Sequence, residues 1–168
     1  MAEYGHIVHP FGPLYDAHSR VLILGSLPSV RSREAMFFYG HPQNRFWPLI
    51  ARLLGEAVPV SVDDKKALLL RRHVALWDTI YSCDIAGSGD ASIRNAVPTD
   101  LRRVVAESEI TAVFCNGQTS GRYYRQYHEP VLGIPAVVLP STSPANAAWT
   151  PDRLAQAWQA VPDALRQT

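Results

Sequence analysis

The sequence predicts an α/β fold, a three-layer sandwich in which helices flank a central, mainly parallel sheet of four strands. Two observations predict it. Short apolar runs that end in glycine or proline recur along the chain, and stretches with helix start signals separate them. Where strands alternate with helices in this way, the sheet is parallel and both of its faces are covered.

Three of the predicted strands are uninterrupted apolar runs. They are residues 20–26 (RVLILGS), 110–117 (ITAVFCNG) and 134–141 (IPAVVLPS). Runs of this length, without alternation of polar and apolar residues, are typical of buried parallel strands. The shorter run 73–77 (HVALW) is the candidate for the fourth strand.

The helices between these strands have recognisable first residues. Ser61, with an acidic residue three positions on, resembles a capping box, and Thr99 is placed to cap a second helix. Thr150 is a third cap, followed by Pro151 at the first helical position. A further helix is expected to begin after Asn44, with apolar residues spaced for one buried face. These residues are Phe46, Trp47, Leu49, Ile50, Leu53 and Leu54.

Composition restricts the class of protein. The 168 residues suit a single domain (1–168), with 47% hydrophobic and 18% charged residues. The chain has no run of about 18 apolar residues that could cross a membrane, and its N-terminus lacks the features of a signal peptide. Two cysteines, Cys83 and Cys115, are too few for a disulfide framework or a four-thiolate metal site. We therefore expect a cytoplasmic protein without cofactor or metal.

Charge gives little evidence about partners. The formal net charge of +1 makes no electrostatic case for nucleic acid, although 14 of the 16 basic residues are arginine. Arginine favours bidentate contacts with phosphate, but a GC-rich genome also replaces lysine by arginine. All histidines except His41 are scattered without metal-ligand spacing, and we expect them to be structural or surface residues.

Three segments follow the predicted strands: 25–29 (GSLPS), 115–118 (CNGQ) and 140–146 (PSTSPAN). Ligands of open parallel sheets bind outside the carboxyl ends of the strands, so we expect these segments to meet at one edge. Gly25 permits close backbone approach there, and Asn116 either faces the same pocket or completes a turn. Each segment also has a plain interpretation as a turn between a strand and a helix.

The segment after the last strand combines two kinds of side chain. Its hydroxyl groups can donate to phosphate oxygens. Its rigid tip can form a wedge that enters a DNA duplex. The hydroxyl residues are Ser141, Thr142 and Ser143, and the wedge is Pro144, Ala145 and Asn146.

The stretch 37–47 (FFYGHPQNRFW) concentrates aromatic rings around a His-Pro turn and one asparagine. Phe37, Phe38 and Tyr39 precede the turn in a loop that we expect to be partly exposed. At least one ring is then available to stack on a flat ligand. Asn44 is either a plain helix cap or a carboxamide that holds a water molecule or the edge of a base.

Together these stretches resemble the uracil-DNA glycosylase superfamily, most closely its hypoxanthine-DNA glycosylase (DNA-deoxyinosine glycosylase) branch, a neighbour of the mismatch-specific uracil and thymine glycosylases. The matching stretches are 22–50 (LILGSLPSVRSREAMFFYGHPQNRFWPLI), 75–95 (ALWDTIYSCDIAGSGDASIRN), 112–117 (AVFCNG) and 139–146 (LPSTSPAN). Their order and spacing cover residues 7–160. The resemblance implies the uracil-DNA glycosylase-like sandwich and a site that receives a base flipped out of DNA.

The resemblance also implies residue roles. It makes Asn44 the catalytic residue and Tyr39 the aromatic that stacks on the flipped base. The segment 143–146 would grip phosphate and fill the gap left by that base. The implied base-binding residues are Gly25, Ser26, Leu27, Phe38, Tyr39 and Asn116.

Two positions depart from the superfamily pattern. Leu27 stands where efficient uracil glycosylases carry an Asp and mismatch-specific relatives an Asn, and Ser141 replaces the His or Asn that usually begins the second motif. Both usual polar catalysts are missing, so Asn44 is left to orient water or to stabilise the leaving base. We therefore predict a slow, monomeric, monofunctional glycosylase that excises deaminated bases, chiefly hypoxanthine, from DNA in base excision repair. The proposed site has no lysine, so no Schiff-base step is expected.

Three alternatives stay open. One is a mismatch-specific uracil-DNA glycosylase that uses the same site. Another is a non-catalytic binder of damaged DNA. The third is an acid–base enzyme that uses Asp78, Asp84 or Asp90, although Asp78 is expected to cap or orient the structure, and Asp84 and Asp90 to lie in a loop.

Overall fold

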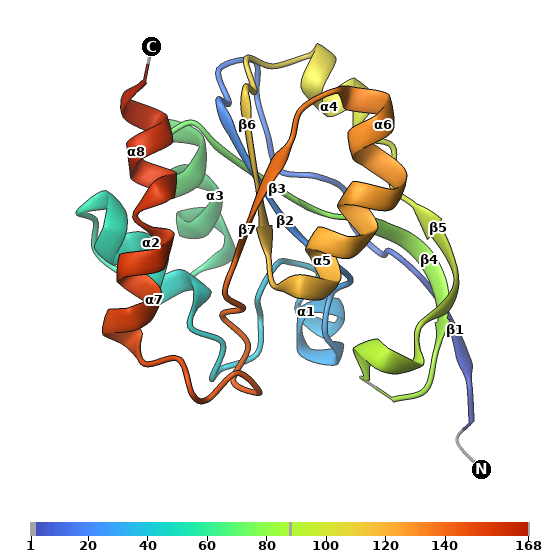
Figure 1. Cartoon of the computed structure of the whole chain (residues 1–168). Coiled ribbons are helices and arrows are strands. Elements are labelled where there is room, and N and C mark those ends of the chain that lie inside the picture. Colours follow the sequence, from blue (N-terminus) through green and yellow to red (C-terminus); the bar gives the residue numbers. More distant parts are fainter. Residues whose placement is uncertain (1–2, 88, 168) are drawn as a thin grey trace.

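A computed structural model describes residues 3–87 and 89–167. A four-stranded parallel sheet forms the centre of the molecule, in the order β3-β2-β6-β7 (Figure 1). The strands are β2 (Val21–Gly25), β3 (Val74–Asp78), β6 (Ala112–Asn116) and β7 (Ala136–Leu139). The predicted sheet, including its fourth strand, is therefore confirmed.

Helices cover both faces of this sheet, as predicted. The helices on one side are α2 (Phe46–Leu54), α3 (Val62–Arg71), α7 (Pro151–Trp158) and α8 (Ala160–Arg166) (Figure 1). The other side carries α4 (Arg102–Ala106), α5 (Gln118–Tyr123), the π-helical turn η2 (Tyr124–His128) and α6 (Glu129–Leu132). The short α1 (Val30–Ala35) lies below the carboxyl ends of the strands.

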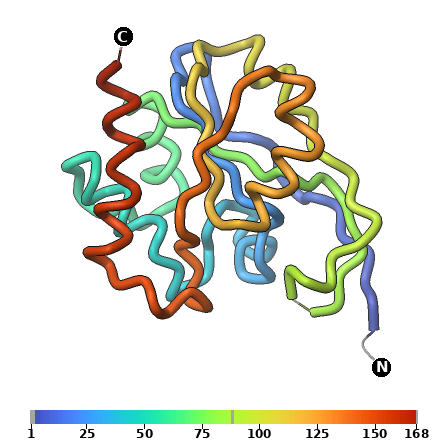
Figure 2. Tube along the Cα trace, in the orientation of Figure 1, coloured from blue at the N-terminus to red at the C-terminus, as the bar shows by residue number. Residues whose placement is uncertain are grey.

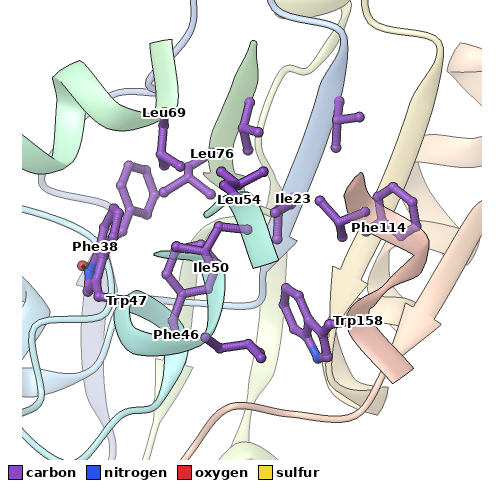
Figure 3. Packing of buried hydrophobic residues seen from close by; sticks show 14 of the residues in the cluster. Ile23, Phe38, Phe46, Trp47, Ile50, Leu54, Leu69, Leu76, Phe114 and Trp158 are labelled. Carbon is purple, nitrogen blue, oxygen red and sulfur yellow. Dashed lines mark hydrogen bonds between the residues drawn. The ribbon is translucent and has the colours of Figure 1, made fainter. Parts of the chain in front are cut away.

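The central strand β2 divides two hydrophobic cores. Successive side chains of a strand point to opposite faces, so Val21 and Ile23 join one cluster while Leu22 and Leu24 join the other. In the larger cluster, Phe46 of α2 and Trp158 of α7 pack beside Ile23 (Figure 3). No helix in the described part of the chain is long and apolar enough to cross a membrane.

A second, antiparallel sheet was not predicted. Its order is β1-β4-β5, made of β1 (Gly5–Val8), β4 (Ile80–Ile85) and β5 (Arg94–Pro98). Asp84 therefore lies within strand β4 rather than in a loop, where it binds His6 and Asn95. Asp90 lies in the short 3-10 turn η1 (Asp90–Ser92), between β4 and β5.

Most helix starts follow the sequence. Ser61 accepts a hydrogen bond from the N–H of Asp64 at 3.0 Å, and Thr150 accepts one from Arg153 at 3.2 Å, with Pro151 in the first turn. The prediction for Thr99 was wrong, because α4 begins at Arg102. The Thr99 hydroxyl instead donates to the carbonyl oxygen of Asp78 at 2.7 Å, so a tertiary contact has displaced the local cap.

At least one of the three rings of the aromatic loop was expected outside the core; two are buried and Tyr39 is half-buried. Phe37 and Phe38 are 5% and 2% exposed, because Trp47 stacks on the first ring and Phe11 packs edge-on against the second. Both rings therefore belong to the core, which leaves Tyr39 as the ring of this loop that a ligand can reach.

Candidate active site

A cavity of about 1130 Å³ opens at the carboxyl ends of the parallel strands. The strand-end segments predicted to meet do so here. Residues 25–33, with Ile85, Gly87, Gly89 and Asp90, form one side, and residues 116–119 and 138–146 form the other. In Figure 2 the chain after β7 runs beside the loop that precedes α2, and the backbone hydrogen bond from Arg45 to Thr142, 3.1 Å long, joins the two.

Gly25 leaves room at the floor of this cavity. A β-carbon at Gly25 would lie 2.4 Å from Oδ1 of Asp78 and 3.4 Å from the hydroxyl of Tyr39, so even alanine would collide with the carboxylate. The carbonyl groups of Gly25 and Ser26 accept hydrogen bonds from Thr79 and Ile80, at 2.8 and 3.0 Å. Residues 25–26, after β2, are thus held by backbone hydrogen bonds to residues 79–80, and their other face is open to the cavity.

Leu27 follows in the same loop and has no polar role. Its side chain packs against a small cluster that contains Ile80, Cys83 and Ile85. The apolar contact accounts for the departure noted in the sequence, since a carboxylate or amide at this position would meet an apolar surface.

Asn44 supports the start of a helix and also lines the cavity. Its Oδ1 accepts hydrogen bonds from the N–H of Phe46 at 2.9 Å and from the hydroxyl of Thr142 at 2.8 Å. Helix α2 begins at Phe46, with Arg45 in the cap position, so Asn44 supports the helix start from one residue before it. Its Nδ2 donates to no described residue, and Asn44 lines the cavity. The cap therefore fixes the amide with its donor side available.

Asn116 extends this network and also lines the cavity. Its Nδ2 donates to the hydroxyl of Thr142 and its Oδ1 accepts from the N–H of Thr142, both at 3.0 Å. The amide thus has a partner on each side. The Thr142 hydroxyl has one proton to donate. It accepts a hydrogen bond from Asn116 and directs its own proton at Oδ1 of Asn44. Asn116 therefore orients Thr142, and Thr142 orients Asn44.

Arg45, which no sequence pattern indicated, holds the 141–149 loop through hydrogen bonds from its guanidinium. We call this segment the pinned loop. The Nη2 atom of Arg45 donates to the carbonyl oxygens of Ser143 and Asn146, both at 3.0 Å, and Nη1 donates to that of Trp149. Backbone carbonyl acceptors leave no pattern in a sequence. Only the position of an arginine directly after Asn44 could have drawn attention to it.

Within this loop, the three predicted hydroxyl donors differ. Thr142 is 1% exposed and committed to Asn44, so the idea that it donates to phosphate was wrong. Ser141 and Ser143 accept local N–H bonds of 3.1 and 3.2 Å, and each is only half-buried. Their hydroxyl protons make no hydrogen bond to a described residue.

The predicted wedge is a turn closed by Asn146. The Nδ2 atom of Asn146 donates to the carbonyl oxygen of Ser141 at 3.0 Å, and its N–H donates to that of Ser143 at 3.0 Å. Pro144 is half-buried and Ala145 is exposed at the tip. The small exposed tip is therefore held in one conformation by its own hydrogen bonds.

Tyr39 lies at the cavity floor in a left-handed conformation with φ of 54°. One face of its ring stacks on Phe46, at 4.2 Å between centroids and 20° between planes. Its hydroxyl is buried and has no hydrogen-bond partner among the described residues. Burial, followed by the negative charge of Asp78, raises the pKa of Tyr39 above its usual range, so the phenol stays protonated.

Asp78 and His9 form a buried pair behind Gly25. Nε2 of His9 lies 2.6 Å from Oδ2 of Asp78, and the two side chains are 0% and 5% exposed. Nδ1 of His9 accepts from the N–H of Phe11 at 3.4 Å, so the proton of the imidazole sits on Nε2 and points at the carboxylate. Oδ1 of Asp78 makes no hydrogen bond to a described residue, and Asp78 lines the cavity. The expected orienting role thus accounts for only one of its oxygens.

Other side chains considered in the sequence lie elsewhere. Lys65 and Lys66, on α3, are over the rings of Trp47 and Phe37 and do not line the cavity. Asp90 lines it and Asp84 does not. Among the described residues, no group of three His, Cys, Asp or Glu side chains could hold a metal ion.

Fold and site together define an α/β sandwich that carries an amide network and a pinned loop around one cavity at the edge of its parallel sheet. The chain belongs to the uracil DNA glycosylase superfamily, whose family profile matches residues 13–163.

Similar proteins agree over nearly the whole chain. A hypoxanthine DNA glycosylase of Methanosarcina acetivorans is 33% identical over 156 residues, which cover 90% of this chain and 95% of that protein. A hypoxanthine DNA glycosylase of Methanosarcina barkeri is 31% identical over 141 residues, 81% of this chain and 86% of that protein. The solution structure of a candidate uracil DNA glycosylase from M. acetivorans superposes with a TM-score of 0.79 at 30% identity, covering 96% of this chain and all of that one.

Proposed function

We propose that this protein is a monofunctional DNA glycosylase that flips deaminated bases, above all hypoxanthine, out of DNA and hydrolyses their N-glycosidic bond. It would act as a monomer on DNA in the cytoplasm. The observation that carries the proposal is the network from Asn116 through Thr142 to Asn44, which presents an amide donor to the cavity of a superfamily member. Relatives named hypoxanthine DNA glycosylases support the choice of base.

The first step is extrusion of the base, which costs a few kcal/mol and less for a mispaired base. Stacking on an aromatic ring returns about 1–3 kcal/mol. Phe46 covers one face of Tyr39, so the base would stack on the opposite face. The exposed tip at Ala145, held by Asn146, would occupy the gap left in the duplex.

Bond cleavage follows through an oxocarbenium-like sugar. Asn44 would use its Nδ2 to donate a hydrogen bond to the leaving base, or to the oxygen of the attacking water so that this water is held beside the sugar. The donor is preorganised, because Phe46 and Thr142 occupy Oδ1 and fix the orientation of the amide. Removal of one preorganised donor of this kind costs about 10²–10³ in rate.

Asp78 is our candidate for reading the base, beside Asn116, which stays a predicted base-binding residue. The Asn116 amide already has a partner on each side, whereas Oδ1 of Asp78 is unpaired among the described residues. A carboxylate only accepts hydrogen bonds. Hypoxanthine N1 and uracil N3 carry a proton, but adenine N1 and cytosine N3 carry a lone pair. An acceptor here would therefore favour the deaminated bases over their parents.

The test is single-turnover excision on labelled duplexes with one hypoxanthine, uracil or xanthine, followed by alkali. We expect cleavage at hypoxanthine, reduced about 10²–10³-fold in Asn44→Ala. Gln43→Ala removes an exposed neighbouring amide and should cleave like the wild type. Equal cleavage by Asn44→Ala would leave the glycosylase and reduce Asn44 to a helix cap.

The same assay separates the alternatives. Cleavage at uracil in mismatches but not at hypoxanthine would identify a uracil-directed enzyme. Lesion-dependent binding without alkali-labile product would identify a non-catalytic binder, a possibility that Leu27 and Ser141 motivate. Borohydride should trap no covalent complex, and trapping through Lys65 or Lys66 would contradict the monofunctional assignment.

A further inference from the structure

Arg33 lies on α1, on the side of the cavity opposite the pinned loop. Its side chain is half-buried and lines the cavity. Nε is sealed from solvent and has no hydrogen-bond partner among residues 3–87 and 89–167. The two terminal nitrogens also make no hydrogen bond there, but they are not sealed. The outer edge of the guanidinium is thus the part that a ligand can reach.

The lack of a partner distinguishes Arg33 from the other arginines. Within the described chain, every other arginine except Arg125 contacts a carboxylate, a backbone carbonyl or an aromatic ring. Arg125 is exposed, so water solvates its charge. A half-buried charge without a partner costs free energy, and this cost is offset when an anion binds.

Two other arginines lie at or beside the site. Arg31 also lines the cavity, but it is exposed and lies 4.0 Å from the carboxylate of Glu34. The guanidinium of Arg45 already donates to the carbonyl oxygens of Ser143, Asn146 and Trp149. The nearby acids have partners or positions elsewhere: Asp84 binds His6 and Asn95, and Asp90 makes no ion pair with Arg33. Arg33 is therefore the half-buried arginine of this cavity wall that has no partner among the described residues.

We infer that Arg33 binds a phosphodiester group of the DNA strand that carries the flipped nucleotide. The inference rests on the proposed function, because DNA is the polyanion that this site would receive. Guanidinium forms two parallel hydrogen bonds to phosphate, and its outer edge has two nitrogens for that geometry. The strand is then held on both sides of the flipped base, by Arg33 on one side and by the 141–146 loop on the other.

The test compares binding of a fluorescent hypoxanthine duplex across 50–200 mM salt for the wild type, Arg33→Gln, Arg33→Lys and Arg125→Gln. One phosphate contact contributes about one unit to the slope of log K against log salt. Arg33→Gln should lose about one unit of slope and bind about tenfold more weakly. Arg33→Lys should keep the slope but recover only part of the affinity. Arg125→Gln, with the same loss of charge, should match the wild type.

A neutral methylphosphonate placed at single positions around the lesion would identify the phosphate. At one position it should weaken the wild type as much as Arg33→Gln does, and the variant should lose nothing further there, because both changes remove one contact. Additive losses at every position would overturn the inference, as would an unchanged slope and affinity in Arg33→Gln. Thermal melting of each variant verifies its fold.

Failure of this inference can be told from failure of the proposed function. If the wild type excises hypoxanthine but Arg33→Gln binds DNA normally, only the inferred role of Arg33 is contradicted. If the wild type binds DNA without excision, the salt slopes still decide the role of Arg33. If the wild type neither excises hypoxanthine nor binds DNA, the proposed function and the role of Arg33 are both contradicted.

Discussion

The two sides of the cavity differ in how completely their polar groups are satisfied. The pinned side, residues 44–46, 116 and 141–149, is closed by hydrogen bonds from Arg45, Asn116 and Asn146. The open side, residues 25–33 with Asp78, keeps an unpaired carboxylate oxygen and an unpaired guanidinium among the described residues. The loop of the pinned side is thus held by its own hydrogen bonds and presents free donors at Asn44, Ser141 and Ser143, whereas the open side leaves an anionic oxygen and a cationic guanidinium without a partner among the described residues.

The largest effect should come from breaking the pinned side at its centre. Arg45→Ala leaves three loop carbonyls without their donor, and we expect excision to fall by about 10³ or more. The free energy of unfolding should drop on the order of 3 kcal/mol, measured by urea unfolding. Arg45→Lys, which keeps the charge but lacks the planar fork, should restore only part of both. Normal excision by Arg45→Ala would show that activity does not depend on the hydrogen bonds from Arg45 to the loop.

On the open side, Asp78→Asn should reduce hypoxanthine excision about 10²-fold. Nε2 of His9 would still donate to the amide oxygen, so the amide nitrogen would face the N1 proton of the base. Single-turnover rates on hypoxanthine and adenine duplexes measure this change, and the preference for hypoxanthine should shrink. Asp90→Asn, which changes another acid of the cavity, is the matched control. Equal rates for Asp78→Asn and the wild type would leave Asp78 a purely structural residue.

Thr142→Val tests the hydrogen-bond network that orients Asn44 within the pinned side. Valine keeps the shape but removes the hydroxyl that Asn44 and Asn116 share. We expect kcat to fall about tenfold with little change in KM, since the Asn44 donor stays but loses its orientation. Thr142→Ser should recover most of the rate. A change in KM alone would instead assign Thr142 to DNA binding.

The smallest predicted effect is a loss of folding stability at acidic pH. Burial lowers the pKa of His128, whose Nε2 lies 2.9 Å from the carbonyl oxygen of Thr79. A histidine whose pKa is depressed by folding stabilises the fold above its unfolded pKa of about 6.5, and this stability is lost as pH falls below it. Thr79 in turn donates its N–H to Gly25, so acid should loosen the open side.

Urea midpoints measured at pH 7.5 and 5.5 check this expectation. The wild type should lose stability between the two, and His128→Gln should lose less. An equal loss in both proteins would place the acid sensitivity elsewhere.

The parts of the fold that could be predicted from the sequence depend on local signals. The apolar run of β2, the Ser61 cap and the Thr150-Pro151 start involve residues within a few positions of each other. The antiparallel sheet could not be predicted, because β1 pairs with β4 across more than 70 residues and the register of β4 with β5 is interrupted by bulges. Non-local pairing leaves no trace in a short window.

In the site, the strand-end segments were predicted, but the partners of their side chains were not. Asn44 was identified by its place in the motif, whereas the roles of Arg45 and Asp78 depend on a distant loop and on His9. The sequence predicted that at least one ring of residues 37–39 is available but not which one; Phe38 is buried because Phe11, from a different part of the chain, covers it. Burial of a loop side chain depends on what the tertiary fold places over it.

The loop held by Arg45 also bears on how such a protein would search DNA. Fixing a residue of a flexible loop costs about 1–2 kcal/mol. Here that cost is met once, during folding, and is not repeated at each encounter with the duplex. A rigid tip can test successive base pairs without rearranging, so the residence time at an undamaged pair stays short. The time spent at each position then depends on how readily the base leaves the stack.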